Sequence, residues 1–167
     1  SGSGKSTLMK SLYFDFDVTE GQGYLRDFRG GKEDIFSQSL PQKKYIKNHI
    51  MGMVYQNPVL GLRMDYSSAG NIAEKLIAAG HRNYGKMNER VEELLNAVEI
   101  LPSRKKEPPA NFSGGMQQRV QISKALANNP AILLLDEVTT GLDLSVQARV
   151  LELIREIRRE FHVSILL

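Results

Sequence analysis

The first residues of the chain are of the types that bind phosphate. Gly4, Lys5 and Ser6 stand in the order found in phosphate-binding loops. The glycine lets backbone N–H groups turn onto an anion, the lysine is a cation for the β and γ phosphates, and the hydroxyl can bind Mg2+. The first glycine of the full pattern would precede Ser1, so a flexible terminus with a chance lysine is the alternative. The residues expected to hold the phosphates are Ser1, Gly2, Ser3, Gly4, Lys5, Ser6 and Thr7.

Two adjacent carboxylates follow an apolar run near the end of the chain. The run from 132 to 135 predicts a buried strand, and Asp136 and Glu137 stand at its carboxyl end, where ligands bind in open α/β sheets. We expect Asp136 to hold Mg2+ together with Ser6, and Glu137 to orient or deprotonate an attacking water. A strand that ends in a solvated turn is the alternative.

A third segment, Phe112–Arg119, reads Phe-Ser-Gly-Gly-Met-Gln-Gln-Arg. Ser113 and the backbone of Gly114 and Gly115 would form a second anion site at the N-terminus of a helix. The alternative is a capped helix preceded by a flexible loop. It explains Ser113, but it does not explain the two consecutive glycines and the Gln-Gln-Arg sequence after them.

These three segments together resemble the ABC-type ATPase family. The resemblance implies that ATP and Mg2+ are the cofactors and that ATP is hydrolysed between two ABC ATPase domains, which form a homodimer or a heterodimer. It also implies that the second anion site acts on the γ-phosphate of ATP held by the other domain. The residues assigned to that contact are Ser113, Gly114, Gly115 and Gln117.

Two further segments resemble family motifs. Gln56 follows the expected strand 51–55 and resembles the glutamine whose amide oxygen reaches Mg2+ and the attacking water, although a plain turn is the alternative. Gly141-Leu142-Asp143 resembles the segment whose aspartate contacts the opposing domain, and Asp143 could equally cap a helix. The implied catalytic residues are Glu137, Lys5 and Gln56, and the implied Mg2+ ligands are Ser6, Gln56 and Asp136.

The surrounding pattern predicts the elements that position these residues. Apolar side chains at helical spacing and turn residues predict the helices 5–13, 68–80, 87–98, 114–128 and 144–160. Short apolar runs predict strands at 24–28, 51–55, 132–135 and 163–167. This alternation predicts an α/β fold with a mainly parallel sheet, which the resemblance specifies as a P-loop NTPase fold of the ABC ATPase type.

We expect one ABC ATPase domain over residues 1–167, with a helical subdomain at about 58–125. The opening inside a motif and the ending inside a strand suggest a fragment truncated at both ends. The residue that stacks on adenine and the switch histidine of the family would lie outside it. We therefore expect the fragment alone to be inactive.

Composition limits the remaining classes of function. The chain has 41% hydrophobic and 25% charged residues, a net charge of +3 and no cysteine, which is ordinary for a globular domain and excludes disulfides and thiolate metal sites. The basic clusters lie in expected surface segments, so we expect no direct nucleic acid partner, and no apolar run is long enough for a transmembrane segment. The expected location is cytoplasmic, with a peripheral position on the inner face of the membrane as the alternative.

Within the family, the stretches 56–63, 69–72 and 79–85 resemble the ATP-binding subunit of the phosphonate carbon–phosphorus lyase system, which would place a soluble lyase core opposite the insertion. The alternative is an ATPase subunit of a peptide or nickel importer, whose insertion would face a membrane permease. A DNA-repair or chromosome-organising ATPase would carry long coiled-coil insertions, and a regulatory nucleotide binder would be expected to lack Lys5 or Glu137.

Overall fold

Three parallel strands form the centre of the fold in a computed structural model that describes residues 4–167. They are β1 (Met51–Val54), β2 (Ile132–Leu135) and β3 (Ser164–Leu166), in the order β1-β2-β3. Met51 pairs with Ile132, and Ile132 pairs with Ser164. β1 and β2 are buried almost throughout, as is typical of parallel strands covered on both faces. The prediction of a mainly parallel α/β fold is confirmed.

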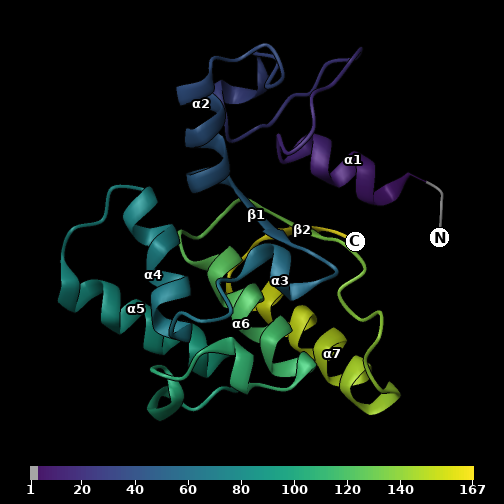
Figure 1. Ribbon diagram of the computed structural model, residues 1–167. Coiled ribbons are helices and arrows are strands. Elements are labelled where there is room, and N and C mark those ends of the chain that lie inside the picture. Colours follow the sequence, from purple (N-terminus) through teal and green to yellow (C-terminus); the bar gives the residue numbers. More distant parts are fainter. Residues whose placement is uncertain (1–3) are drawn as a thin grey trace.

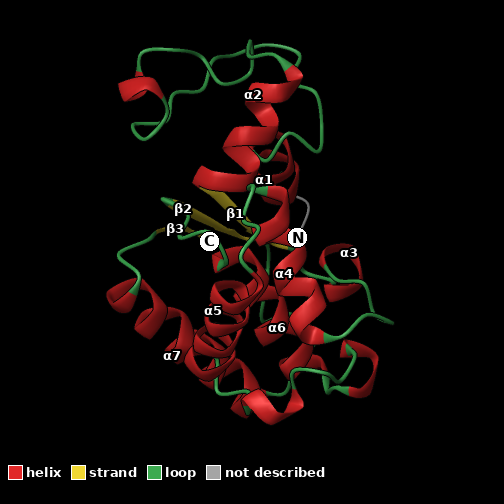
Figure 2. Cartoon of the chain, turned by 90° about the vertical axis from the view of Figure 1, so that its left-hand side faces the viewer, coloured by secondary structure: helices red, strands yellow, loops and turns green. Residues whose placement is uncertain are grey.

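Helices cover both faces of this sheet. Figures 1 and 2 show α1 and α2 on one side and α4 to α7 on the other. The helices are α1 (Lys5–Leu12), α2 (Leu40–Tyr45), α3 (Pro58–Gly61), α4 (Ser68–Ala78), α5 (Tyr84–Ala97), α6 (Gly114–Leu126) and α7 (Leu144–Glu160). A π-helical turn (Ile46–Ile50) follows α2, and short 3-10 turns lie at Arg29–Gly31, Pro102–Arg104 and Pro109–Asn111.

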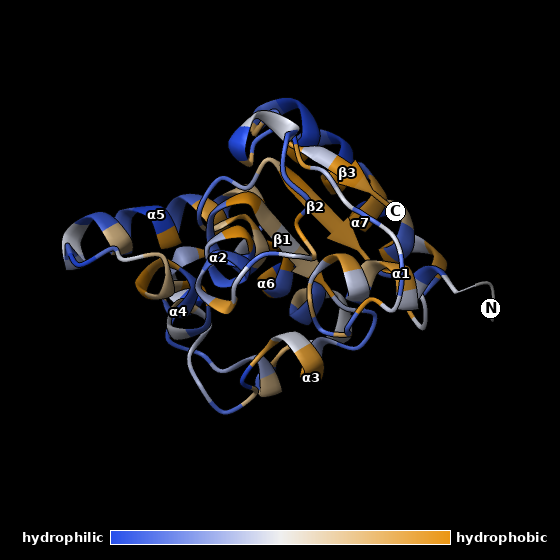
Figure 3. Cartoon of the chain, turned by 90° about the horizontal axis from the view of Figure 1, so that it is seen from above, coloured by the Kyte–Doolittle hydropathy of each residue, from blue (hydrophilic) through white to orange (hydrophobic). Residues whose placement is uncertain are grey.

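The core divides into two clusters because successive residues of a strand point to opposite faces. Leu133 and Leu135 of β2 pack with the side chains of α4 to α7. Leu134 points the other way and packs with Met51, Met53 and the apolar side chains of α1 and of the turn after α2. The sheet is therefore the layer that joins the two halves, and Figure 3 shows β2 and β3 as an apolar patch between more hydrophilic segments.

The predicted helices are confirmed, and their starts follow capping rules. Ser67 accepts a hydrogen bond from Gly70 N at 3.0 Å at the start of α4, and Asn83 accepts one from Lys86 N at 3.0 Å at the start of α5. Gly80 has a φ of +94° directly after α4, a conformation that glycine adopts without strain. Among the described residues, no helix is both long and apolar enough to cross a membrane.

The strand predicted at 24–28 is wrong. This segment forms turns, with Phe28 N bonded to Leu25 O at 2.9 Å, and the Asp34 carboxylate accepts hydrogen bonds from Gly23 N at 2.8 Å and Phe36 N at 3.2 Å. β-propensity depends on a neighbouring strand to complete the backbone hydrogen bonds. No described strand lies beside this segment, so local bonds to Asp34 decide its shape.

α2 was not predicted, although a signal for it exists. Ser39 and Gln42 have the spacing of a capping box, and Gln42 Oε1 accepts a hydrogen bond from Ser39 N at 3.4 Å. Pro41 stands in the first turn, where a missing N–H costs nothing. These residues would have supported a helix at this position.

Candidate functional site

The carboxyl ends of β1 and β2 bring together side chains that are far apart in the sequence. Val54 and Leu135 are paired at these ends, and Asp136 N donates a hydrogen bond to Val54 O at 2.9 Å. Gln56 therefore leaves β1 beside the point where Asp136 and Glu137 leave β2. This edge of the sheet is where open α/β folds bind ligands.

The hydroxyl of Ser6 meets the carboxylate of Asp136 at this edge. Ser6 Oγ donates to Asp136 Oδ1 at 2.6 Å across 130 positions of sequence. Asp136 is only 3% exposed, so this hydrogen bond gives the buried carboxylate a polar partner. The contact brings the N-terminus of α1 to the end of β2.

This pair of oxygens fits the donor set of Mg2+. Hard cations take oxygen ligands, and Mg2+ is usually held by one or two protein oxygens together with phosphate oxygens. The described residues contain no group of three or more His, Cys, Asp or Glu side chains that could hold a metal alone. The site thus suits a magnesium ion that arrives with a phosphate ligand.

The segment predicted to bind phosphate is described from Gly4 onward. Gly4 has a φ of +80° directly before α1, and its carbonyl accepts a hydrogen bond from Leu8 N at 2.9 Å. Lys5 is exposed at the first position of α1, and Thr7 is exposed as well. Ser1, Gly2 and Ser3, which were also assigned to the phosphates, lie outside the described residues.

Glu137 is held in a bent backbone conformation next to Gln56. Its φ is +43°, which is uncommon for a residue with a side chain. Gln56 Nε2 donates to Glu137 Oε2 at 3.3 Å, and Thr140 Oγ1 donates to the same oxygen at 3.3 Å. The two predicted side chains thus lie in contact. Thr140 was not predicted, and its spacing of three residues from Glu137 was the available signal.

The predicted second anion site lies at the N-terminus of α6. Ser113 is exposed, and its Oγ accepts a hydrogen bond from Met116 N at 3.4 Å, which confirms the predicted helix cap. Gly114 is exposed beside it. Within the described part of the chain, no hydrogen bond joins Ser113 to Ser6 or to the carboxylates that follow β2.

The neighbouring Gly115 and Gln117 have contacts that shape this segment. Gly115 is buried, and an added Cβ would lie 2.6 Å from Val146 Cγ1, so the glycine permits the close approach of α6 and α7. Gln117 Nε2 donates to Pro109 O and to Phe112 O, each at 3.0 Å. Gly115 is therefore enclosed between α6 and α7, whereas Gln117 is half-buried and its amide joins α6 to the loop before it.

Asp143 stands at the N-cap position of α7, yet its side chain accepts no capping hydrogen bond. The side chain is exposed. The turn before it is made by Gly141, with a φ of +80°, and by the hydrogen bond from Gln147 Nε2 to Leu142 O at 2.7 Å. Capping by the side chain therefore does not explain an aspartate at this position.

Comparison with known proteins gives one family. The model of the ABC transporter family matches residues 1–140. The chain is 37% identical over 167 residues to the provisionally assigned phosphonates utilization ATP-binding protein PhnK of Escherichia coli (strain K12), covering 100% of this chain and 64% of that protein. It is 35% identical over 166 residues to the oligopeptide transport ATP-binding protein AppF of Bacillus subtilis (strain 168), covering 99% of this chain and 49% of that protein.

Solved structures that resemble this chain are ATP-binding cassettes of the same family. An ATP-binding cassette in a dimeric, post-hydrolysis state bound to ADP and Pi has a TM-score of 0.82 and 28% identity, covering 98% of this chain and 68% of that chain. A bacterial ABC transporter cassette, also dimeric, has a TM-score of 0.83 and 28% identity, covering 99% of this chain and 69% of that chain. The sequence-predicted fold is thereby confirmed at the level of the family's architecture.

Proposed function

The chain belongs to the ABC transporter family of ATP-binding proteins, and from this premise we propose that it binds MgATP and hydrolyses it at the edge formed by β1, β2 and the start of α1. The observation that carries the proposal is the contact of Ser6 with Asp136 beside that of Gln56 with Glu137. An oxygen pair for the metal and a carboxylate for the water are the groups that phosphoryl transfer to water requires.

Each side chain has a role in this proposal. Lys5 pairs with the β and γ phosphates, and Ser6 and Asp136 hold Mg2+, which neutralises charge on the phosphate oxygens when bound. Gln56 orients the attacking water, and Glu137 accepts its proton as the oxygen attacks the γ-phosphorus. The bond between the γ-phosphorus and the β,γ-bridging oxygen breaks, and ADP leaves with that oxygen. Thr140 keeps the Glu137 carboxylate in one orientation.

A second ABC ATPase domain completes the site in our proposal. Ser113 and Gly114 expose the N-terminus of α6, whose N–H groups and dipole suit the γ-phosphate of ATP on the partner domain. Asp143 is exposed without a capping bond, which leaves it available to the opposing domain. Gly115 and Gln117 act by shaping this surface rather than by direct contact.

The chain spans 64% and 49% of the length of the two curated relatives described above. We therefore propose that it works within a longer subunit and that the chain alone is inactive. Segment 58–125 would be the helical subdomain that meets the partner. We favour the phosphonate lyase system, with a soluble lyase core as partner in the cytoplasm, because the identity to a phosphonates utilization ATP-binding protein is the higher of the two, 37% against 35%, and spans the larger share of the relative, 64% against 49%.

The second candidate is the ATPase subunit of a peptide or nickel importer, peripheral on the inner face of the membrane. It is favoured by the 35% identity to an oligopeptide transport ATP-binding protein. Neighbouring genes separate the two candidates. Genes for a lyase core would support the first, and genes for two permeases with a binding protein would support the second.

Replacement of the buried carboxylate tests the ATPase proposal. In the full-length subunit, Asp136→Asn removes the charge that Ser6 contacts, so Mg2+-dependent ATP hydrolysis should fall by about 10^2-fold or more in a phosphate-release assay. Asp65→Asn, at an exposed position, is the matched control. Wild-type turnover by Asp136→Asn would refute the site.

A further inference from the structure

Gln121 of α6 holds both backbone groups of Tyr55. Gln121 Oε1 accepts a hydrogen bond from Tyr55 N at 2.6 Å, and Gln121 Nε2 donates to Tyr55 O at 3.1 Å. The side chain is only 1% exposed. In a sheet, a residue can exchange two hydrogen bonds with a neighbouring strand, one at its N–H and one at its C=O. The primary amide of Gln121 bonds to the same two groups of Tyr55.

The position of Tyr55 explains why such a partner is needed. β1 ends at Val54, so the backbone of Tyr55 and Gln56 leaves the sheet and, within residues 4–167, has no strand beside it. Buried backbone groups require partners. Gln118, one turn before Gln121 on α6, supplies the next bond, because its Nε2 donates to Gln56 O at 2.9 Å. Gln121 Nε2 also donates to Gln118 Oε1 at 3.0 Å, so the two amides brace each other.

Close packing on both sides keeps Gln121 in one place. An added Cβ at Gly52 of β1 would lie 2.5 Å from Ala125 O, which shows how near α6 approaches the strand. An added Cβ at Gly61 would collide with the amide of Gln121 itself. The side chain therefore has little freedom to move away from Tyr55.

The side chain of Tyr55 is anchored from the opposite direction. Its hydroxyl donates to Asp15 Oδ2 at 2.6 Å. Burial, together with Asp15, raises the pKa of this hydroxyl, so Tyr55 stays protonated as a donor. With its backbone held by α6 and its ring held by the loop after α1, Tyr55 is a fixed point from which Gln56 extends toward Glu137.

We propose that Gln121 is a positioning residue for ATP hydrolysis. It replaces the missing strand neighbour of Tyr55 and so fixes the backbone from which Gln56 reaches Glu137. Because small misplacements of a reacting group slow a reaction strongly, loss of this support lowers the turnover number more than the affinity for ATP. The inference rests on the function proposed above for Gln56 and Glu137.

The test uses the full-length subunit and two variants. Gln121→Met keeps the volume but removes all three hydrogen bonds, and Gln121→Glu keeps the acceptor for Tyr55 N while losing both donors. Ser123→Ala is the matched control, because Ser123 is also buried on α6 but donates to Leu94 O of α5 instead. Thermal unfolding of all three variants shows that they are folded.

Two measurements report on different parts of the inference. Amide hydrogen exchange at Tyr55 should accelerate in Gln121→Met, because its N–H loses its partner, and should stay slow in Ser123→Ala. The kcat of Gln121→Met should fall about tenfold with little change in KM. The kcat of Gln121→Glu should fall as well, because its buried carboxylate faces the oxygens of Tyr55 and Gln118 to which the amide donates. In a Gln56→Ala background, Gln121→Met should cause no further loss, since it acts through Gln56.

The outcomes separate this inference from the proposed function. Slow exchange at Tyr55 in Gln121→Met, unchanged kcat, or an undiminished tenfold loss in the Gln56→Ala background would each overturn the role of Gln121. Wild-type turnover by Gln56→Ala alone would instead overturn the proposed role of Gln56, and with it the route through which Gln121 acts.

Discussion

At the scale of single residues, the neighbouring carboxylates of Asp136 and Glu137 have different surroundings. Asp136 is buried and bonded to the Ser6 hydroxyl, whereas Glu137 is half-buried and accepts hydrogen bonds from Gln56 and Thr140. The bent backbone at Glu137 turns its side chain toward a different set of groups. In the proposed site, Asp136 can therefore bind the metal while Glu137 contacts the attacking water.

Glu137→Gln should separate hydrolysis from binding. The substitution keeps the size of the side chain but removes the carboxylate, so hydrolysis in the full-length subunit should fall by about 10^2-fold or more. ATP binding should remain, because Ser6 and Asp136 are unchanged. Phosphate release measures the first quantity, and calorimetry measures the second.

Glu89→Gln, at an exposed position of α5, is the control for that experiment. Unchanged turnover by Glu137→Gln would mean that Glu137 is only the end of a strand. Lost ATP binding in a folded variant would assign Glu137 to the metal site instead.

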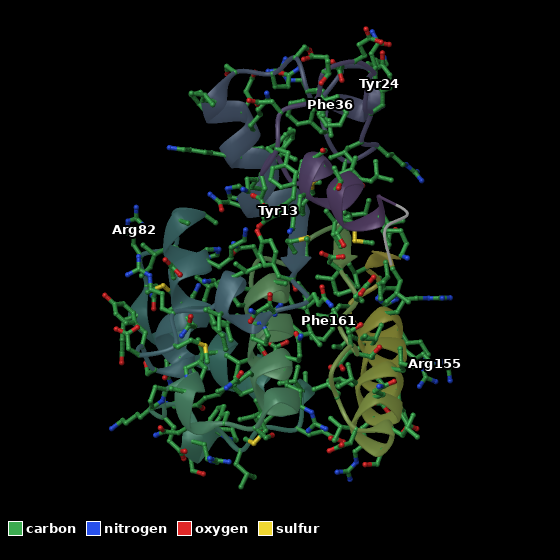
Figure 4. All side chains as sticks on the ribbon, turned by 45° about the vertical axis from the view of Figure 1, so that its right-hand side comes forward. Tyr13, Tyr24, Phe36, Arg82, Arg155 and Phe161 are labelled. Atoms are coloured by element: carbon green, nitrogen blue, oxygen red, sulfur yellow. The ribbon has the colours of Figure 1, made fainter. Side chains whose placement is uncertain are left out.

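Lys75 should make stability depend on pH. Its Nζ donates a hydrogen bond to Tyr13 OH at 2.9 Å. Figure 4 shows Tyr13 between the part of the molecule that contains α1 and α2 and the part that contains α4 to α7. Burial lowers the pKa of Lys75 to about 8. The unfolded lysine has a pKa of about 10.4, so between these values the unfolded chain binds more protons and the free energy of unfolding rises with pH.

Urea unfolding between about pH 7.5 and pH 9.5 checks this prediction. The free energy of unfolding of the wild type should rise across this window relative to that of Lys75→Met, while Lys86→Met, at an exposed position, should follow the wild type. Higher pH is avoided because burial raises the pKa of Tyr13 and of Tyr55, which lowers stability once the unfolded tyrosines ionise near pH 10. Parallel curves for wild type and Lys75→Met would contradict the prediction.

At the scale of elements, α6 is the helix on which the site depends. Its first turn carries Ser113 and Gly114, its middle holds Tyr55 through Gln121, and it packs against β1 at Gly52. One helix thus connects the proposed anion site, at its exposed start, to the segment that carries Gln56.

Gly52→Ala should loosen that packing. The new Cβ would lie 2.5 Å from the backbone oxygen of Ala125, and a backbone atom cannot rotate away, so α6 must shift from β1. We expect a loss of about 1–3 kcal/mol in the free energy of unfolding, measured by thermal or urea denaturation.

Gly85→Ala in α5 is the matched control. The nearest atom to its new Cβ is Asn83 Oδ1 at 3.4 Å, and alanine is the better helix former, so stability should be unchanged or slightly higher. Equal stability of Gly52→Ala and Gly85→Ala would show that α6 can move without cost.

At the scale of the whole molecule, the proposed site is divided between two domains. The exposed end of α6 has no hydrogen bond to Ser6 or Glu137 within residues 4–167. In the proposed arrangement, the exposed Ser113 and Gly114 at that helix end would contact a ligand held by a second ABC ATPase domain.

Ser113→Arg should therefore prevent ATP-dependent dimerisation of the full-length subunit while sparing nucleotide binding by the monomer. The large side chain would fill the surface on which the partner's ATP should rest. Light scattering with and without ATP measures the oligomeric state. Ser103→Arg, at an exposed position in a 3-10 turn, is the control, and a Ser113→Arg protein that dimerises and turns over normally would reduce Ser113 to a helix cap.

The local features of this protein follow from its sequence. Helix starts such as Ser113 and helix ends such as Gly80 are determined within a few residues, and the apolar run Ile132–Leu135 predicts its own burial. The order of the motif residues along the chain indicates the family without reference to their contacts. Such signals are local because capping and periodicity involve neighbours along the chain.

Only the tertiary structure decided which of these residues meet. The Ser6 to Asp136 bond joins positions 130 apart, and Gln121 reaches Tyr55 across 66 positions. In the sequence, Gln121 is a single polar residue between Val120 and Ile122, and nothing near it indicates a partner. The strand predicted at 24–28 is replaced by turns for the same reason, because a strand forms only where a neighbour completes its hydrogen bonds. Contacts between distant segments depend on how helices and strands pack, and local sequence carries no direct record of that packing.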